Sequence, residues 1–218
     1  MTAGRQSRFI TLEGGEGAGK STQIRHLVAR LKENGIAALP TREPGGSPRA
    51  EDIRAVILSG TAVRLAPLAE ALLFAAARAD HLAATIRPAL DRGEWVVCDR
   101  FSDSTRAYQG ARGGVDTGTL EAIDRIVVGE TRPDLTLILD LPATTGMARA
   151  AARRGSSAEI DRFEREALDF HEALRRDFLA IAAAEPARCA VIDASGSEKA
   201  VADAIWAVVR ARLLGGAA

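Results

Sequence analysis

The 218-residue sequence has few cysteines, few aromatic residues and no excess of either charge. Its two cysteines, Cys98 and Cys189, form no disulfide framework and lack the spacing of metal ligands. Cys98 lies inside an apolar run, so we expect it to be a buried thiol. The 29 basic and 29 acidic residues balance to a formal net charge of +0, whereas nucleic-acid-binding proteins usually have a basic excess. The composition therefore indicates no nucleic-acid partner.

Long apolar runs are also missing. No stretch approaches the ~18 apolar residues that a membrane-spanning helix needs, and even the apolar segment 66–77 is interrupted by Glu70. The apolar run that follows Met1 to Arg8 is too short for the core of a signal peptide. We therefore expect a cytoplasmic protein without a membrane partner.

Short apolar runs alternate along the chain with longer stretches of helical periodicity. The short runs are nearly continuous in apolar residues, which predicts parallel strands buried on both faces, at 9–12, 36–39, 95–98, 135–139 and 190–192. The longer stretches predict helices at 20–34, 67–90, 120–128, 143–153, 162–184 and 197–213. This order predicts one α/β domain over residues 1–218, with a five-stranded parallel sheet and helices on both faces.

One glycine-rich segment, residues 14–21, fits the pattern GxxxxGK(S/T) and lies between a predicted strand and a predicted helix, as in P-loop NTPases. Backbone N–H groups of such a loop point at phosphate oxygens, and the helix N-terminus adds the positive end of its dipole. We expect Lys20 to reach the β- and γ-phosphates of ATP and Ser21 to coordinate Mg²⁺. The predicted ATP-binding residues are Gly14, Gly15, Glu16, Gly17, Ala18, Gly19, Lys20, Ser21 and Thr22.

Two other classes of P-loop protein fit the sequence poorly. A GTPase reads guanine with Asn-Lys-x-Asp, but the one asparagine, Asn34, is followed by Gly35. Transport and remodelling ATPases usually have Asp-Glu after an apolar strand, whereas the predicted strands here are followed by Asp99-Arg100 and Asp140-Leu141. A small-molecule kinase is the class that remains.

Charged residues follow two further predicted strands, at the carboxyl edge where open α/β sheets bind ligands. Asp99 can hold Mg²⁺ or its waters, and Arg100 can hold the phosphate of an acceptor in a bidentate fork. A surface ion pair between these two residues is the alternative. Arg42, in the loop 41–46 after the second strand, belongs to the same edge.

Phe74 and Arg78 lie four residues apart on a predicted helix and hence on one face. The ring can stack on a nucleotide base while the guanidinium bonds the carbonyl edge of that base. An aromatic residue in an alanine-rich helix is more often part of the core. Arg78 is harder to explain as core, because an unpaired buried guanidinium is costly.

Arginines also surround a segment of small residues, Gly155 to Ala158. The pattern favours a short lid over residues 149–162 that closes over ATP and brings positive charge to the transferred phosphoryl group. A solvated basic turn is the alternative. The arginines concerned are Arg149, Arg153, Arg154 and Arg162.

Taken in order, these segments resemble the bacterial thymidylate kinase family. The resemblance is carried by the blocks 13–22, 41–46, 74–78, 99–101, 104–105, 107–110, 132–136 and 161–164. It implies an ATP:dTMP phosphotransferase that makes dTDP for dTTP biosynthesis, with Lys20, Arg100, Arg153 and Arg154 as catalytic residues. It also implies a homodimer. Gly17 stands where some members of the family have an arginine, which implies that the lid supplies the positive charge.

The same resemblance implies roles around the acceptor. Phe74 would stack on thymine and Arg78 would bond its O4 edge, while Tyr108 would crowd the C2′ position of the sugar. The implied dTMP-binding residues are Glu16, Arg42, Phe74, Arg78, Arg100, Ser104, Thr105, Tyr108 and Gln109, and the implied metal ligands are Ser21 and Asp99. Two rivals remain, namely another P-loop nucleoside or nucleotide kinase and a non-catalytic ATP-binding module.

Overall fold

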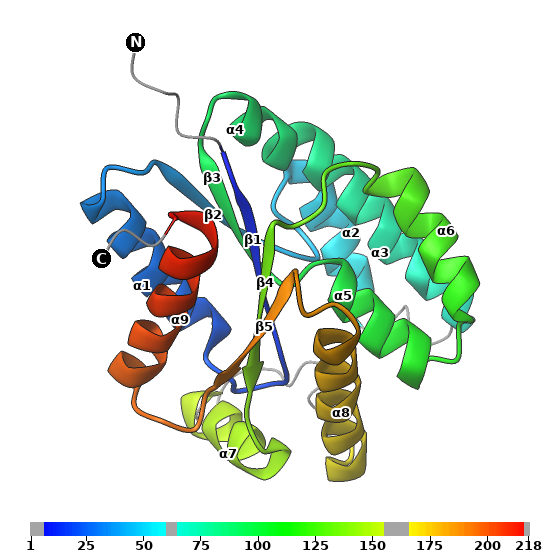
Figure 1. Ribbon diagram of the computed structural model, residues 1–218. Helices are drawn as coiled ribbons and strands as arrows, with labels where there is room; N and C mark the ends of the chain where they lie inside the picture. Colours follow the sequence, from blue (N-terminus) through cyan, green and yellow to red (C-terminus); the bar gives the residue numbers. More distant parts are fainter. Residues whose placement is uncertain (1–6, 60–64, 155–165, 216–218) are drawn as a thin grey trace.

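The structure is a computed structural model that describes residues 7–59, 65–154 and 166–215 (Figure 1). Its centre is one sheet of five parallel strands in the order β2-β3-β1-β4-β5. The strands are β1 (Phe9–Glu13), β2 (Ala38–Arg42), β3 (Trp95–Asp99), β4 (Leu135–Asp140) and β5 (Cys189–Asp193). The predicted P-loop NTPase fold, with its five-stranded parallel sheet, is confirmed.

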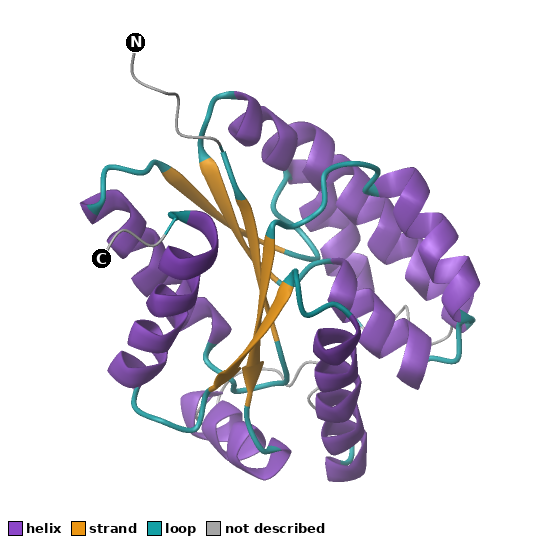
Figure 2. Cartoon of the chain, viewed as in Figure 1, coloured by secondary structure: helices purple, strands orange, loops and turns teal. Residues whose placement is uncertain are grey.

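Helices cover both faces of the sheet (Figure 2). On one face lie α1 (Lys20–Glu33) and α9 (Glu198–Leu213), which pack against each other. The opposite face carries α2 (Pro48–Leu58), α3 (Pro67–His81), the π-helical turn η2 (Leu82–Ile86), α4 (Arg87–Asp91), α5 (Ser102–Thr105), η3 (Arg106–Arg112), α6 (Thr117–Val127) and α8 (Leu168–Ala184). The remaining helix, α7 (Ala143–Arg154), follows β4 at the lower edge in Figure 1. Within the described residues, no helix is both long and apolar enough to cross a membrane.

The three inner strands are buried because their side chains alternate between apolar clusters on the two faces of the sheet. In β1, Ile10 and Leu12 pack toward α1 and α9, while Phe9 packs with Phe101 on the other face. Cys98 in β3 is fully buried, as predicted. Burial on both faces explains why these strands read as continuous apolar runs in the sequence.

Parallel pairing brings the ends of the inner strands to the same level. Leu12 of β1 is in register with Asp99 of β3, and the N–H of Arg100 donates to the carbonyl of Leu12 at 2.9 Å. Next to them, the N–H of Glu43 donates to the carbonyl of Asp99 at 2.9 Å. The loops that follow β1, β2 and β3 therefore start side by side at the carboxyl edge of the sheet.

The prediction for the second strand was wrong in position. We expected a doubly buried strand at 36–39, but β2 begins at Ala38 and continues through Pro40 to Arg42. It is an edge strand whose residues are half-buried or exposed, so a proline without an N–H is tolerated there. Ile36 is buried ahead of the strand.

Each of the six predicted helices is present, but some differ in detail and other helices were missed. The helix expected at 67–90 is a continuous helical path whose middle, Leu82–Ile86, widens into a π-helical turn. The helix expected from Arg162 begins at Leu168 in the described chain, after Glu166 and Ala167. Helix α2 and the helical segment 102–112 were not predicted, because neither has a clear apolar stripe in the sequence.

Candidate active site

The glycine-rich loop joins β1 to α1 at the carboxyl edge of the sheet. Gly19 caps α1 with φ 91°, in the left-handed region that only glycine enters without strain. Because Gly19 has no side chain, the first N–H groups of α1 face the loop without a side-chain acceptor from their cap. A helix start of this kind can bind an anion, as the motif predicts.

Lys20 is the first residue of α1, and its side chain turns back across the loop. Its Nζ donates to the carbonyl of Gly14 at 3.0 Å and to that of Gly15 at 2.9 Å. The ammonium is buried, and this burial together with the nearby Arg100 lowers the pKa of Lys20. The cation is thus fixed inside the loop rather than extended into solvent.

Ser21 and Asp99 meet where β1 and β3 end. Ser21 Oγ donates to Asp99 Oδ2 at 2.7 Å. Two adjacent oxygens of this kind suit Mg²⁺, which usually takes one or two protein ligands and completes its shell with phosphates and water. Among the described residues no group of three or more His, Cys, Asp or Glu side chains is arranged to hold a metal. The pair therefore fits a cation that arrives with a nucleotide better than a resident structural metal.

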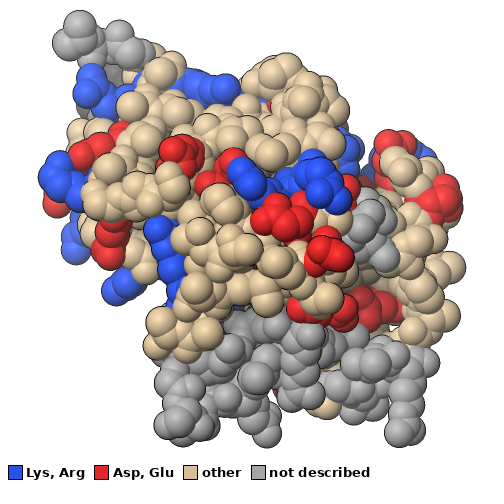
Figure 3. All heavy atoms as spheres, turned by 90° about the horizontal axis from the view of Figure 1, so that it is seen from below, with Lys and Arg blue, Asp and Glu red and all other residues tan. Residues whose placement is uncertain are grey.

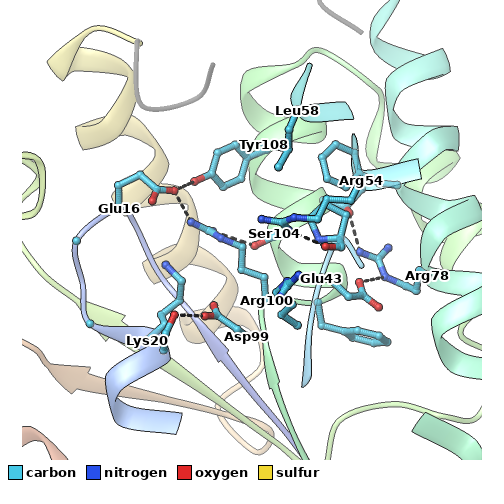
Figure 4. A pocket seen from close by; sticks show the side chains of 18 of the residues that line it. Glu16, Lys20, Glu43, Arg54, Leu58, Arg78, Asp99, Arg100, Ser104 and Tyr108 are labelled. Carbon is cyan, nitrogen blue, oxygen red and sulfur yellow. Dashed lines mark hydrogen bonds and ion pairs between the residues drawn. The ribbon is translucent and has the colours of Figure 1, made fainter. Parts of the chain in front are cut away.

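Arg100 occupies the centre of the site (Figure 4). It is the one non-glycine residue in the described chain with positive φ, at 65°. Its Nη2 donates to Glu16 Oε1 at 2.5 Å, its Nη1 donates to Ser104 Oγ at 3.2 Å, and its guanidinium lies 5.2 Å from the centroid of the Tyr108 ring. Backbone strain of this kind is tolerated where the surrounding structure fixes the residue, and it is concentrated at functional sites.

Glu16, in the phosphate loop, is the carboxylate partner of Arg100. Burial by itself would raise the pKa of Glu16, but Arg100 and Lys20 outweigh it and lower the pKa to about 2. The carboxylate therefore stays ionised at neutral pH. The hydroxyl of Tyr108 also donates to Glu16 Oε1, at 3.4 Å, and burial raises the pKa of Tyr108.

Arg78 is buried, but it is paired with a carboxylate. It therefore does not carry the cost of an unpaired buried guanidinium. Its Nε donates to Glu43 Oε2 at 2.8 Å and its Nη2 donates to Thr105 Oγ1 at 3.0 Å. The guanidinium also lies 5.0 Å from the centroid of the Phe101 ring. Glu43 takes a further contact at 3.0 Å from the ring of His81, so a small polar network holds Arg78 in one orientation.

Phe74 belongs to the cavity wall and not to the core. Its side chain is half-buried, one turn before Arg78 on α3, and it is absent from the apolar clusters of the described chain. The structure therefore places the Phe74 side chain at the cavity and not among the core side chains. A base stacked there would also reach Arg78.

One cavity of about 570 Å³ joins these groups. All nine residues predicted for the acceptor line it, namely Glu16, Arg42, Phe74, Arg78, Arg100, Ser104, Thr105, Tyr108 and Gln109. Of the predicted donor residues, Glu16, Gly17, Gly19, Lys20, Ser21 and Thr22 line it, whereas Gly14, Gly15 and Ala18 do not. Seen from the carboxyl edge, acidic and basic side chains gather near the middle of this face (Figure 3).

The cavity wall includes residues that the sequence reasoning did not assign to the site. They are Arg25, Glu43, Pro44, Arg54, Leu58 and Phe101. Arg54 and Leu58 come from α2, the helix that was not predicted. The charged loop after β2 was expected at the ligand edge and contains Glu43. Nothing in the sequence indicated that Glu43 pairs with Arg78.

The lid prediction falls largely outside the described part of the chain. Residues 155–165, including Arg162, and the side chains of Arg153 and Arg154 are not described. The backbone of α7 does extend to Arg154. Arg149, on the same helix, donates to the carbonyls of Ala194 at 3.0 Å and Ser195 at 3.3 Å.

Glu13, the last residue of β1, is fully buried beneath the site. Its Oε1 accepts from the N–H of Phe101 at 2.7 Å and from that of Ser104 at 3.3 Å, and its Oε2 accepts from Ser104 Oγ at 2.6 Å. Burial and the nearby Asp103 raise the pKa of Glu13 to about 7. These three hydrogen bonds tie the segment that follows Arg100 to the strand that precedes the phosphate loop.

Comparisons with known proteins agree on one family. A sequence model described as thymidylate kinase matches residues 12–205. The thymidylate kinases of Rhodopseudomonas palustris (strain TIE-1) and Bradyrhizobium diazoefficiens are 59% and 56% identical to this chain, and each alignment covers 96% of it and 91% of the relative. The crystal structure of thymidylate kinase from Ehrlichia chaffeensis superposes with a TM-score of 0.75 at 31% identity, covering 93% of this chain and 98% of the other.

The raised pKa of Glu13 makes a prediction about stability. Between its ordinary value of 4.5 and about 7, the folded state binds more protons at Glu13 than the unfolded state, so its contribution to the free energy of unfolding falls as pH rises. Denaturant titrations at several pH values measure this fall in the free energy of unfolding. Between pH 4.5 and about 7, the fall should be about 2–4 kcal/mol smaller in Glu13→Gln than in the wild type. Glu130→Gln, at an exposed carboxylate, should keep the wild-type slope. An unchanged slope in Glu13→Gln would contradict the assignment.

Proposed function

Because this chain belongs to the thymidylate kinase family, we infer that it transfers the γ-phosphoryl group of ATP to dTMP, giving ADP and dTDP. The reaction is a step in dTTP biosynthesis, and we place it in the cytoplasm. We assign it to residues 1–218 as one domain, because the strands from β1 to β5 share one sheet and α9 returns to pack on α1.

The observation that carries this proposal is the meeting of two half-sites in one cavity. The phosphate loop lines one end, the predicted dTMP-binding residues line the other, and Arg100 lies between them. Phosphoryl transfer needs donor and acceptor held in line with the charge between them neutralised. A module that only bound ATP would not need a second, arginine-bearing half.

On the donor side, we assign residues 14–22 to the phosphates of ATP. Lys20, already inside the loop, would bind the β- and γ-phosphate oxygens. Ser21 and Asp99 would hold Mg²⁺. When bound, Mg²⁺ would offset negative charge on the β- and γ-phosphates.

On the acceptor side, we assign Arg42 and Arg100 to the phosphate of dTMP. Arg100 is oriented by Glu16 and Ser104 at one end of the cavity, while Arg42 at the end of β2 is paired with Glu51 at 3.0 Å. Each guanidinium can donate two parallel hydrogen bonds to phosphate oxygens. The two cations would bring the acceptor oxygen, already anionic at neutral pH, next to the γ-phosphate without a general base.

For the nucleoside, Phe74 would stack on thymine and Arg78 would bond its O4 edge. Ser104 and Thr105 lie beside Arg78 and Arg100, where they can reach the base N3. Other contacts would involve Tyr108 against C2′ of the sugar, Glu16 at its 3′-hydroxyl, and Gln109 in the wall beside them. Gln109 is itself held by Glu70, with Nε2 donating to Oε1 at 2.7 Å.

We assign the positive charge on the transferred phosphoryl group to Arg153 and Arg154 in addition to Lys20 and Arg100. Gly17 gives the phosphate loop no arginine of its own. Helix α7 starts beside the loop and leads to these two arginines. A lid over residues 149–162 would close on ATP and exclude water from the reaction.

We further propose that the protein is a homodimer. Three helices, α2, α3 and α6, carry large apolar side chains that are 45–84% exposed, namely Val56, Leu68, Leu72 and Ile126. Helix α3 packs against both α2 and α6, so these residues belong to adjoining surfaces. An exposed apolar surface on neighbouring helices is typical of an interface between subunits.

Replacing Lys20 tests the donor site. Lys20→Ala should lower kcat for dTMP-dependent ADP release by about 10²-fold or more, because the charge that follows the migrating phosphoryl group is lost. Lys32→Ala, which removes an exposed lysine from the last turn of the same helix, should retain wild-type kcat. A Lys20→Ala enzyme as active as the control would refute the assignment of residues 14–21 to the transferred phosphate.

Charged substitutions on the exposed apolar surface test the dimer. Sedimentation velocity should give the wild type twice the 23.0 kDa mass of one chain, and Leu72→Glu combined with Ile126→Glu should give a monomer. Val191→Glu, at a similarly exposed apolar residue on β5, should remain dimeric. A monomeric wild type, or a double variant that stays dimeric, rules out this interface.

A further inference from the structure

The backbone of the phosphate loop closely approaches the backbone of helix α7. A Cβ on Gly17 would lie 2.0 Å from the carbonyl oxygen of Gly146, and a Cβ on Gly146 would lie 2.3 Å from the carbonyl oxygen of Glu16. Both separations are far shorter than any real carbon–oxygen contact, and in each case the neighbour is main chain that cannot rotate away. The loop and the first turn of α7 are therefore packed with no room for a side chain on either.

Helix α7 cannot simply move to make room, because it is held at several points. The N–H of Ala143 donates to Glu172 Oε1 on α8 at 2.8 Å. Further along the helix, Arg149 donates to the carbonyls of Ala194 and Ser195. A methyl group at position 146 would thus push on the peptide of Glu16.

A displaced Glu16 would disturb the centre of the site. The side chain of Glu16 holds Arg100 at 2.5 Å, and the same short loop supplies the two carbonyls that hold Lys20. A shift of about 1 Å in groups of this kind can lower the rate up to about 10²-fold. The first turn of α7 therefore fixes where the phosphate loop lies relative to Arg100.

We propose that Gly146 is a positioning residue for phosphoryl transfer, because its bare Cα lets α7 and the phosphate loop touch and keeps Glu16 in place. The proposal rests on the proposed kinase function of the same cavity. A role in folding alone does not account for a glycine here, because alanine is the better helix former by about 1 kcal/mol. The residue sits inside α7, where glycine has no conformational advantage.

Gly146→Ala is the test, with Gly118→Ala as the matched control. Gly118 is also helical, but it lies on α6 at an exposed position, and a Cβ there approaches only the side chain of Asp116, at 3.1 Å, and no backbone. For wild type and both variants, the measurements are kcat and kcat/KM for ATP, the Kd for dTMP without ATP, and thermal unfolding. We expect Gly146→Ala to lose roughly ten-fold or more in kcat/KM for ATP. The dTMP affinity should fall less than kcat/KM for ATP, because Arg42, Phe74 and Arg78 also line the dTMP end of the cavity. The control should match the wild type.

A second variant shows whether the loss comes from the Cβ itself or from the kind of side chain that carries it. Gly146→Ser carries the same Cβ and should show the same kinetic loss. The proposal is wrong if Gly146→Ala keeps wild-type kinetics, if dTMP affinity and thermal stability fall in step with kcat, or if the variant does not fold. A wild type without dTMP-dependent ADP release would instead refute the proposed function, so the two failures are distinct.

Discussion

The contact between Arg100 and Glu16 joins the two halves of the cavity, and the rest of the site is built around it. Glu16 belongs to the loop after β1 and Arg100 to the turn after β3, 84 residues further along the chain. They meet because β1 and β3 are parallel neighbours, with Leu12 near the end of β1 in register with Asp99 at the end of β3. The pair is largely desolvated, so it costs free energy unless its geometry is well fixed. Glu13, Ser104 and the ring of Tyr108 provide that fixation.

Features that depend on local pattern were predictable from the sequence. The inner strands are buried on both faces and read as apolar runs, and the phosphate loop has a motif whose spacing follows from phosphate geometry. Phe74, Arg78 and Arg100 were placed at the acceptor from their positions in the pattern, and the family resemblance completed the set of nine, all of which line the cavity. Edge strand β2 was misplaced because half of its surface faces solvent, so its proline and arginine do not look like strand residues.

What the sequence could not supply are partners brought together by the fold. Glu13 and Phe101 are 88 residues apart, and Glu43 and Arg78 are 35 apart, so no spacing rule links them. Gly17 illustrates the same limit. Its lack of a side chain was visible, but the reason was not, because the carbonyl of Gly146 that excludes a side chain comes from another helix. A buried charge is stable only when it is paired, and its partner can lie far away in the sequence.

The most direct test of this account is ADP release measured with a panel of acceptors, namely dTMP, dUMP, AMP, CMP and thymidine, together with ATP alone. If the cavity holds ATP on the phosphate loop and a thymine nucleotide between Phe74 and Arg100, dTMP should give the fastest turnover, with one dTDP formed for each ADP. ATP alone and thymidine, which lacks the acceptor phosphate, should give almost none. Faster turnover with AMP or CMP than with dTMP, or ADP release that is independent of any acceptor, would contradict the account.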